Sequence, residues 1–108
     1  MNAREGDVDE VLVALADPTR RRLLDVLSAR PQSTATALAE KLPVSRQAIV
    51  KHLAVLEQAG LVEARKRGRD VQFSVRPERL EATARWMHGV ATAWDERLNA
   101  IKRLAEEQ

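Results

Sequence analysis

Cysteine is absent from the 108-residue chain, and aromatic residues are scarce, with two Trp, one Phe and no Tyr. The lack of cysteine excludes disulfides, thiolate metal sites, cysteine nucleophiles and redox sensing by thiols. With so few aromatic side chains, the core must be built from Leu, Val, Ile and Ala. That composition favours helices.

Long apolar runs are also missing. The longest apolar stretches span only a few residues, far short of the roughly 20 needed for a transmembrane helix. The N-terminus lacks the apolar segment of a secretion signal. We therefore expect a cytoplasmic protein that makes no membrane contact, and a chain of this length fits one domain over residues 1–108.

The net charge is positive only in the middle of the chain. Residues 41–76 carry eight basic and three acidic side chains, whereas residues 1–40 and 77–108 are each slightly acidic. A basic segment of this kind is expected of a protein that binds a polyanion. A solvated charged surface is the alternative that charge alone leaves open.

The first half of the sequence predicts four helices after a flexible end at residues 1–7. Their apolar residues recur at helical spacing, and Asp17, Thr36 and Ser45 are suitable N-caps for the second, third and fourth helices. Gly60 is a suitable C-terminal stop for the fourth. The expected ranges are residues 8–16, 18–29, 37–42 and 46–59.

The second half predicts a β-hairpin and one long helix. Val71, Phe73 and Val75 alternate with polar residues, which is the pattern of a strand, and a basic loop at residues 65–69 separates them from Leu61 and Val62. A helical pattern then runs over residues 78–106. The predicted fold is mainly α with a small hairpin, a winged helix-turn-helix whose residues 8–76 form a DNA-binding core.

The long helix carries apolar residues in a seven-residue repeat. Two apolar positions per heptad are typical of a seam between paired helices. We therefore expect residues 78–106 to pair with the same helix of a second copy and so to join a homodimer. Packing of this helix on its own domain is the alternative. The expected interface residues are Leu80, Ala84, Met87, Ala91, Trp94, Leu98 and Ile101.

The third and fourth helices meet across a turn that we expect to be about three residues long, as in a helix-turn-helix, whose second helix enters the major groove. Counting round the fourth helix leaves five residues facing outward. Arg46 and Gln47 suit guanine and adenine edges, and Val50 suits a thymine methyl. Ser45 and Lys51 suit phosphates, which position the protein without specifying sequence.

Four cations in the predicted hairpin loop would lie beside this helix. They are Arg65, Lys66, Arg67 and Arg69, and they would contact the phosphate backbone or the minor groove. The roles of Arg20 to Arg22 stay open between phosphate binding and simple solvation, and His52 is expected to be a partly buried structural histidine.

Two segments of the chain are similar to a known family. The run from Ser45 to Val62, followed by the Arg67-Gly68-Arg69 hairpin, resembles the ArsR-type winged helix-turn-helix regulators, and residues 14–20 (ALADPTR) resemble that family's opening signature. The resemblance implies a homodimer, joined by its first and last helices, that represses a promoter and is released by an inducer. It leaves open whether the inducer is a small molecule or a protein.

The metal sites of such regulators have no counterpart in this sequence. Many relatives bind metal through Cys on the helix before the reading helix, and residues 34–38 here contain no thiol. Others use Asp, His and Glu on the last helix, where His88 is the single histidine, although Zn²⁺ needs about four ligands. We therefore expect no metal and no cofactor. Because the sequence shows no phosphate loop and no nucleophile paired with a base, we expect no enzymatic activity.

Overall fold

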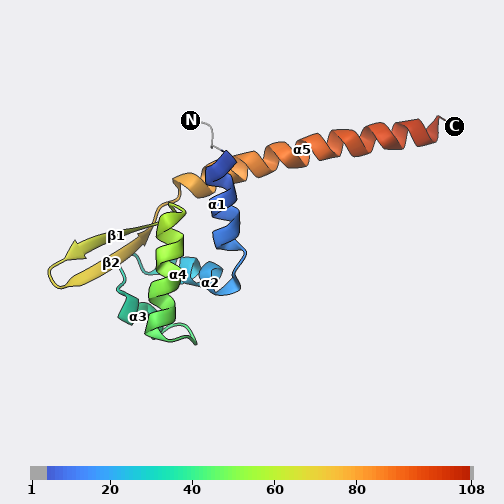
Figure 1. The fold of residues 1–108 in the computed structure, drawn as a ribbon. Coiled ribbons are helices and arrows are strands. Elements are labelled where there is room, and N and C mark those ends of the chain that lie inside the picture. The colour runs from blue at the N-terminus through green and yellow to red at the C-terminus, as the bar shows by residue number, and fades with distance from the viewer. Residues whose placement is uncertain (1–4, 108) are drawn as a thin grey trace.

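The structure is a computed structural model that describes residues 5–107. The chain forms five helices and a two-stranded hairpin within these residues (Figure 1). The elements are α1 (Glu5–Leu15), α2 (Pro18–Ala29), α3 (Ala35–Ala39), α4 (Arg46–Gln58), β1 (Val62–Arg67), β2 (Asp70–Val75) and α5 (Glu78–Glu106). None of the described helices is long and apolar enough to cross a bilayer.

The core is aliphatic, as the composition predicts. It lies where α1 to α4 meet the root of the hairpin, and Phe73 is the aromatic residue that packs against it. Burial at helical spacing orients each helix, because residues three and four apart share one face. The largest fully buried side chains include Leu23, Leu27, Leu38, Ile49, Leu53, Leu56 and Leu61.

Side-chain caps begin three of the helices. Asp17 and Ser45 cap α2 and α4 as predicted. For α3 the prediction of Thr36 was wrong: the Thr34 hydroxyl accepts a hydrogen bond from the Ala37 backbone N–H at 3.1 Å. The helix begins at Ala35, which is buried, and ends at Ala39 rather than at Leu42. Six residues instead of three therefore connect it to α4.

The hairpin is longer than predicted. Antiparallel pairing continues from Val62 opposite Val75 to Arg67 opposite Asp70, so only Gly68 and Arg69 remain in the turn. The expected basic loop is therefore mostly strand. Gly68 has φ +62°, a backbone conformation that glycine adopts at little cost.

The first helix differs at its start from the expected one, whereas the last helix has the expected bounds, 78–106. α1 begins at Glu5 rather than Val8, and residues 1–4 of the predicted flexible end lie outside the described part. α5 packs on α1 through its first turns, where Thr83 is 4% exposed. It then projects clear of the core (Figure 1), which gives the molecule its extents of 70 × 31 × 21 Å.

Candidate nucleic-acid interface

The outward face of α4 is polar and open to solvent. Ile49, Leu53 and Leu56 are buried on its inner face, and Ala48 and His52 are half-buried beside it. The other positions of the first two turns face away from the core. The structure places all five predicted contact residues there in exposed positions: Ser45, Arg46, Gln47, Val50 and Lys51.

Two of these side chains already have partners in the free chain. The Ser45 hydroxyl accepts a hydrogen bond from the Ala48 backbone N–H at 3.1 Å, and so begins the helix. Arg46 donates from Nε to the Thr36 hydroxyl at 3.1 Å. Thr36 therefore braces a candidate reading residue instead of capping α3, a role that sequence reasoning missed because no pattern links positions 36 and 46.

The hairpin carries its cations on two faces. Arg65 and Arg67 line a small hollow of about 70 Å³ together with Gln32 and Ser74. Since side chains alternate along a strand, Lys66 points to the opposite side. All four predicted hairpin cations, Arg69 included, are exposed.

An acidic residue at the root of the hairpin reduces its positive charge. Glu63 pairs with Arg65 and also lies 3.6 Å from Nε of Arg76. The hairpin is attached to the core by a backbone hydrogen bond from the Phe73 N–H to the Ser33 carbonyl at 2.8 Å. The ion pairs found among residues 5–107 leave out Lys66, Arg67 and Arg69.

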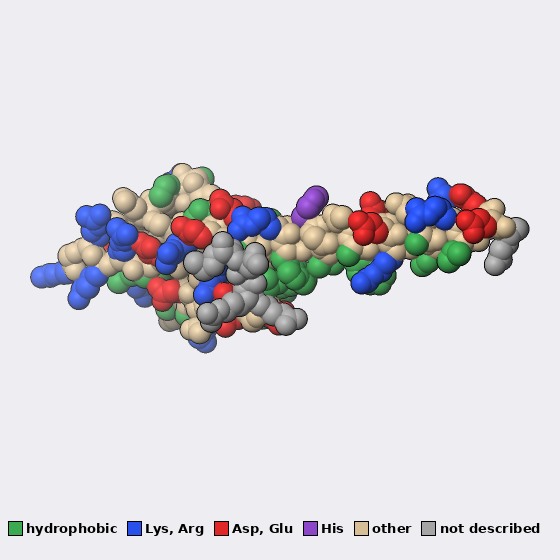
Figure 2. All heavy atoms as spheres, turned by 90° about the horizontal axis from the view of Figure 1, so that it is seen from above, with side chains coloured by type: hydrophobic (Ala, Val, Ile, Leu, Met, Phe, Trp, Pro, Cys, Tyr) green, Lys and Arg blue, Asp and Glu red, His purple; other side chains and the backbone are tan. Residues whose placement is uncertain are grey.

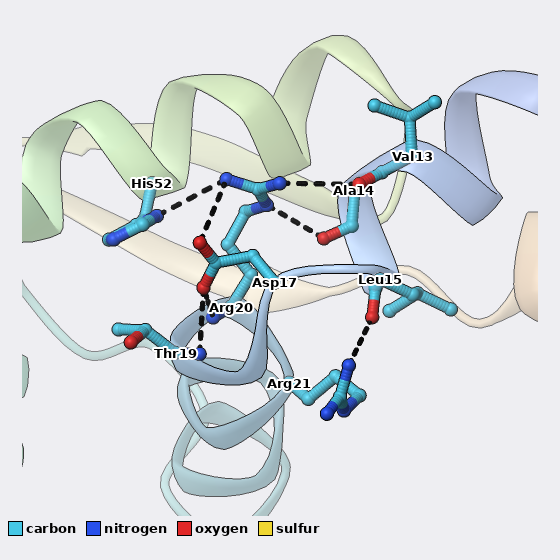
Figure 3. Close-up of polar contacts among 8 residues, drawn as sticks. All are labelled: Val13, Ala14, Leu15, Asp17, Thr19, Arg20, Arg21 and His52. Atoms are coloured by element: carbon cyan, nitrogen blue, oxygen red, sulfur yellow. Dashed lines mark hydrogen bonds and ion pairs between the residues drawn. The ribbon is translucent and has the colours of Figure 1, made fainter.

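Arg20 and Arg21 bind the end of α1, as Figure 3 shows. Arg20 donates to the Ala14 and Val13 carbonyls at 2.7 and 3.2 Å, and Arg21 donates to the Leu15 carbonyl at 2.6 Å. Helix C-termini favour such cations because their last carbonyls have no partner within the helix. These two arginines therefore hold the end of α1, Arg20 from a half-buried position and Arg21 from an exposed one.

The same corner is tied to α4. Nη1 of Arg20 lies 3.5 Å from Nδ1 of the half-buried His52 and 3.8 Å from the Asp17 carboxylate. The pKa of Asp17 is lowered, first because the Arg20 backbone N–H donates to its carboxylate, then through the Thr19 N–H and the Arg20 charge; desolvation opposes these effects in part. A polar cluster of Asp17, Arg20 and His52 thus links α4 to the end of α1 (Figure 3).

The predicted interface residues of α5 have different surroundings. Leu80 packs against the chain's own core. The residues farther along are exposed: Ala84, Met87, Ala91, Trp94, Leu98 and Ile101. Trp86, Val90 and Leu104 extend this apolar surface and do not belong to the predicted heptad positions.

A helix that turns a polar face outward beside a cationic hairpin is the arrangement of a winged helix-turn-helix, a fold that presents one helix to the DNA major groove. A family profile described as "Helix-turn-helix domain" matches residues 15–65, which span α2 to most of β1.

Named transcriptional regulators are similar to this chain in structure or in sequence. An ArsR-like transcriptional regulator from Rhodococcus sp. RHA1 superposes with a TM-score of 0.87 at 43% identity, covering 95% of this chain and 94% of its own. The uncharacterized HTH-type transcriptional regulator YuzN of Bacillus subtilis is 44% identical over 59% of this chain and 76% of its own length. The transcriptional repressor SdpR of Bacillus subtilis is 32% identical over 74% of this chain and 88% of its own.

The chain belongs to the ArsR-type family of winged helix-turn-helix transcriptional regulators. It is a DNA-binding regulator of transcription. The predicted fold class and the predicted family are confirmed, and so is the prediction that the chain is not an enzyme, because these relatives are regulators.

Proposed function

We propose that the protein is a homodimeric repressor that binds a palindromic operator in double-stranded DNA. The observation that carries this proposal is the exposed polar face of α4 next to a hairpin whose basic side chains are exposed. A repressor of this type works in the cytoplasm, where it reaches the DNA of its promoter.

Each group has a distinct role in the proposed complex. Arg46 and Gln47 read base edges, and Val50 contacts a thymine methyl. Ser45 and Lys51 hold phosphates, as do the hairpin cations Arg65, Lys66, Arg67 and Arg69, of which Arg65 must first release Glu63.

The exposed apolar surface of α5 supports a homodimer. Met87, Trp94, Leu98 and Ile101 are each more than half exposed, and a continuous apolar surface on a small protein marks an interaction site. A two-fold dimer would place two copies of α4 about one DNA turn apart, which matches a palindrome.

We further propose that the regulator needs no metal. No cluster of three potential metal ligands occurs among residues 5–107, and the chain has no cysteine. Titration of Zn²⁺ into the protein–DNA complex should leave it intact at stoichiometric metal. Release of the DNA at that ratio would contradict the proposal.

Selection of duplexes from a random pool, followed by binding titrations, tests DNA reading. Arg46→Ala and Gln47→Ala should relax the sequence preference, whereas Lys66→Ala should weaken binding to every duplex alike. The logarithm of the binding constant should fall with the logarithm of salt concentration, by about 0.9 for each phosphate neutralised. Equal affinity of all three variants and the wild type for every duplex, or a preference for RNA, would contradict the proposed function.

A further inference from the structure

Thr36 and Arg46 join the two helices of the helix-turn-helix at its exposed surface. Nε of Arg46 donates to Oγ1 of Thr36 at 3.1 Å, at the point where α3 lies beside the start of α4 (Figure 1). Both residues are exposed, and Arg46 is the first residue of the reading helix. The hydrogen bond therefore lies on the surface that we propose to face DNA.

The packing of the two helices brings these residues together. Ala35 and Leu38, on either side of Thr36, are buried in the core, and Ile49 buries the first turn of α4 in the same core. A threonine side chain is branched at Cβ and has few rotamers. Oγ1 of Thr36 is therefore held opposite the Arg46 side chain before any DNA is bound.

The hydrogen bond leaves the outer end of the guanidinium open to a ligand. Arg46 takes part in none of the ion pairs found among residues 5–107, and its bond to Thr36 uses Nε. The N–H donors of a guanidinium form a rigid planar fork, so Nη1 and Nη2 keep theirs while Nε is occupied. Two parallel donors at the end of the side chain match O6 and N7 of guanine in the major groove.

A tethered arginine discriminates between bases better than a mobile one. An unrestrained arginine loses rotamer freedom when it contacts a base, and this loss opposes binding. The bond to Thr36 imposes part of the loss in the free protein, so contact with a guanine costs less. The fixed guanidinium is also less able to turn towards a phosphate or another base. Thr36 should therefore favour guanine over other bases without raising the affinity for DNA in general.

The general attraction to DNA has a separate source. Figure 2 shows Lys and Arg side chains gathered towards the end of the molecule that carries the hairpin, away from the projecting α5. Lys66, Arg67 and Arg69 are exposed on the hairpin, and such cations attract any duplex through its phosphates. Loss of the Thr36 hydroxyl leaves this charge unchanged. Sequence preference and general affinity can thus be measured separately.

We propose that Thr36 is a positioning residue that makes Arg46 selective for guanine at one position in each half-site of the operator. This inference rests on the proposed reading of bases by Arg46, and it names both the base and the residue of α3 that imposes the choice. Thr36 acts through Arg46 and does not touch the base itself. The first helix of the helix-turn-helix thus takes part in sequence selection by holding a side chain of the second.

Thr36→Val tests the proposal, because valine keeps the branched shape and removes only the hydroxyl. Selection with Arg46→Ala first identifies the position that Arg46 reads. Titrations of duplexes with each base at that position should then show a preference for guanine that is about three- to tenfold weaker in Thr36→Val than in the wild type, the effect of ordering one long side chain. Affinity for a duplex without the operator, and its salt dependence, should stay unchanged. Thr36→Ser should restore the preference, because it restores the hydroxyl.

A double-mutant cycle shows whether Thr36 acts through Arg46. In an Arg46→Ala background, Thr36→Val should have no further effect on the preference among bases. Thr34→Val is the matched control, because it removes the hydroxyl that caps α3; it should lower the melting temperature and leave the preference for guanine in place. An equal loss of preference in Thr34→Val would show that any disturbance of α3 has this effect, and would overturn the inference.

The outcomes separate this inference from the proposed function. If no base preference depends on Arg46, the proposed reading role fails and the inference fails with it. If Arg46→Ala relaxes the preference while Thr36→Val leaves it intact, the inference alone is overturned. Equal weakening of every duplex by Thr36→Val, additive with Arg46→Ala, would identify Thr36 as a phosphate contact and would also overturn the inference.

Discussion

At the scale of single residues, Arg20 connects three parts of the chain. Its guanidinium donates to the end of α1, lies beside the cap of α2 and approaches His52 on α4. A single side chain therefore joins the first helix to the reading helix, and it does so from a half-buried position where hydrogen bonds to a charged group contribute more than on the surface.

Arg20→Met should lower the free energy of unfolding by about 2 kcal/mol, because two carbonyls at the end of α1 lose a charged donor. Urea denaturation at neutral pH measures the change. Arg22→Met is the control: Arg22 is exposed, and a substitution there should change stability by no more than about 0.5 kcal/mol. Equal effects of the two substitutions would show that the α1 contacts contribute nothing.

Asp17 gives a pH-dependent prediction at the same corner. Its pKa is lower in the folded chain than in the unfolded one, so the ionised carboxylate stabilises the fold above its ordinary pKa of about 3.9, and this stability is lost as the pH falls through the folded value. Asp17→Asn retains an N-cap but has no charge to titrate. The variant should be less stable than the wild type at pH 7, and the difference should shrink towards pH 2. Denaturant titrations across this range that show a constant difference would contradict the prediction.

At the scale of elements, Gly60 ends the reading helix. Its φ is +75°, and the Gly60 and Leu61 N–H groups donate to the Glu57 and Leu56 carbonyls at 2.9 Å, the bonding pattern of a Schellman cap. A Cβ at this position would lie 2.7 Å from Cδ of Arg79. The end of α4 and the start of α5 thus meet where glycine is needed for both backbone conformation and space.

Gly60→Ala should therefore destabilise the protein by about 1 to 2 kcal/mol. Gly89→Ala is a matched control within α5, where an added Cβ meets nothing within 4 Å, and it should stabilise the helix by up to about 1 kcal/mol. Thermal unfolding at one protein concentration should show a lower melting temperature for Gly60→Ala and a higher one for Gly89→Ala than for the wild type. Stabilisation by Gly60→Ala would contradict the capping role.

Local signals in the sequence predicted most of the elements. Asp17 before Pro18, and Ser45 before the apolar positions of α4, indicated helix starts that the structure confirms. Residues 34 and 36 are both threonine, and both suit a cap. The choice of Thr34 depends on the burial of Ala35 in the core, which is tertiary information that no local pattern contains.

The same limit applies to the interface. The exposed face of α4 followed from its apolar spacing, because helical periodicity separates buried from exposed positions. The contact of Arg46 with Thr36 could not be predicted, because it depends on the angle between α3 and α4. Basic composition suggested a loop at residues 65–67, whereas cross-strand pairing determined that these residues are strand.

At the scale of the whole molecule, the elongated shape depends on α5, and the proposed dimer depends on its apolar face. Trp94→Asp should yield a monomer that has lost operator binding, because a carboxylate would be buried without a partner at the seam. Sedimentation velocity and a DNA-binding titration measure the two effects. Unchanged circular dichroism would show that the core still folds. If the variant remained a dimer, the proposed α5 seam would be contradicted.

The projecting half of α5 also bears on the lifetime of a single copy. An isolated helix of about 13 residues is marginally stable in water, so in a chain without a partner this segment opens by local unfolding far more often than the core does. Proteases cleave such open segments first. We expect proteases to degrade monomers from their C-terminal ends while homodimers persist. The amount of protein in the cell would then depend on dimerisation soon after synthesis.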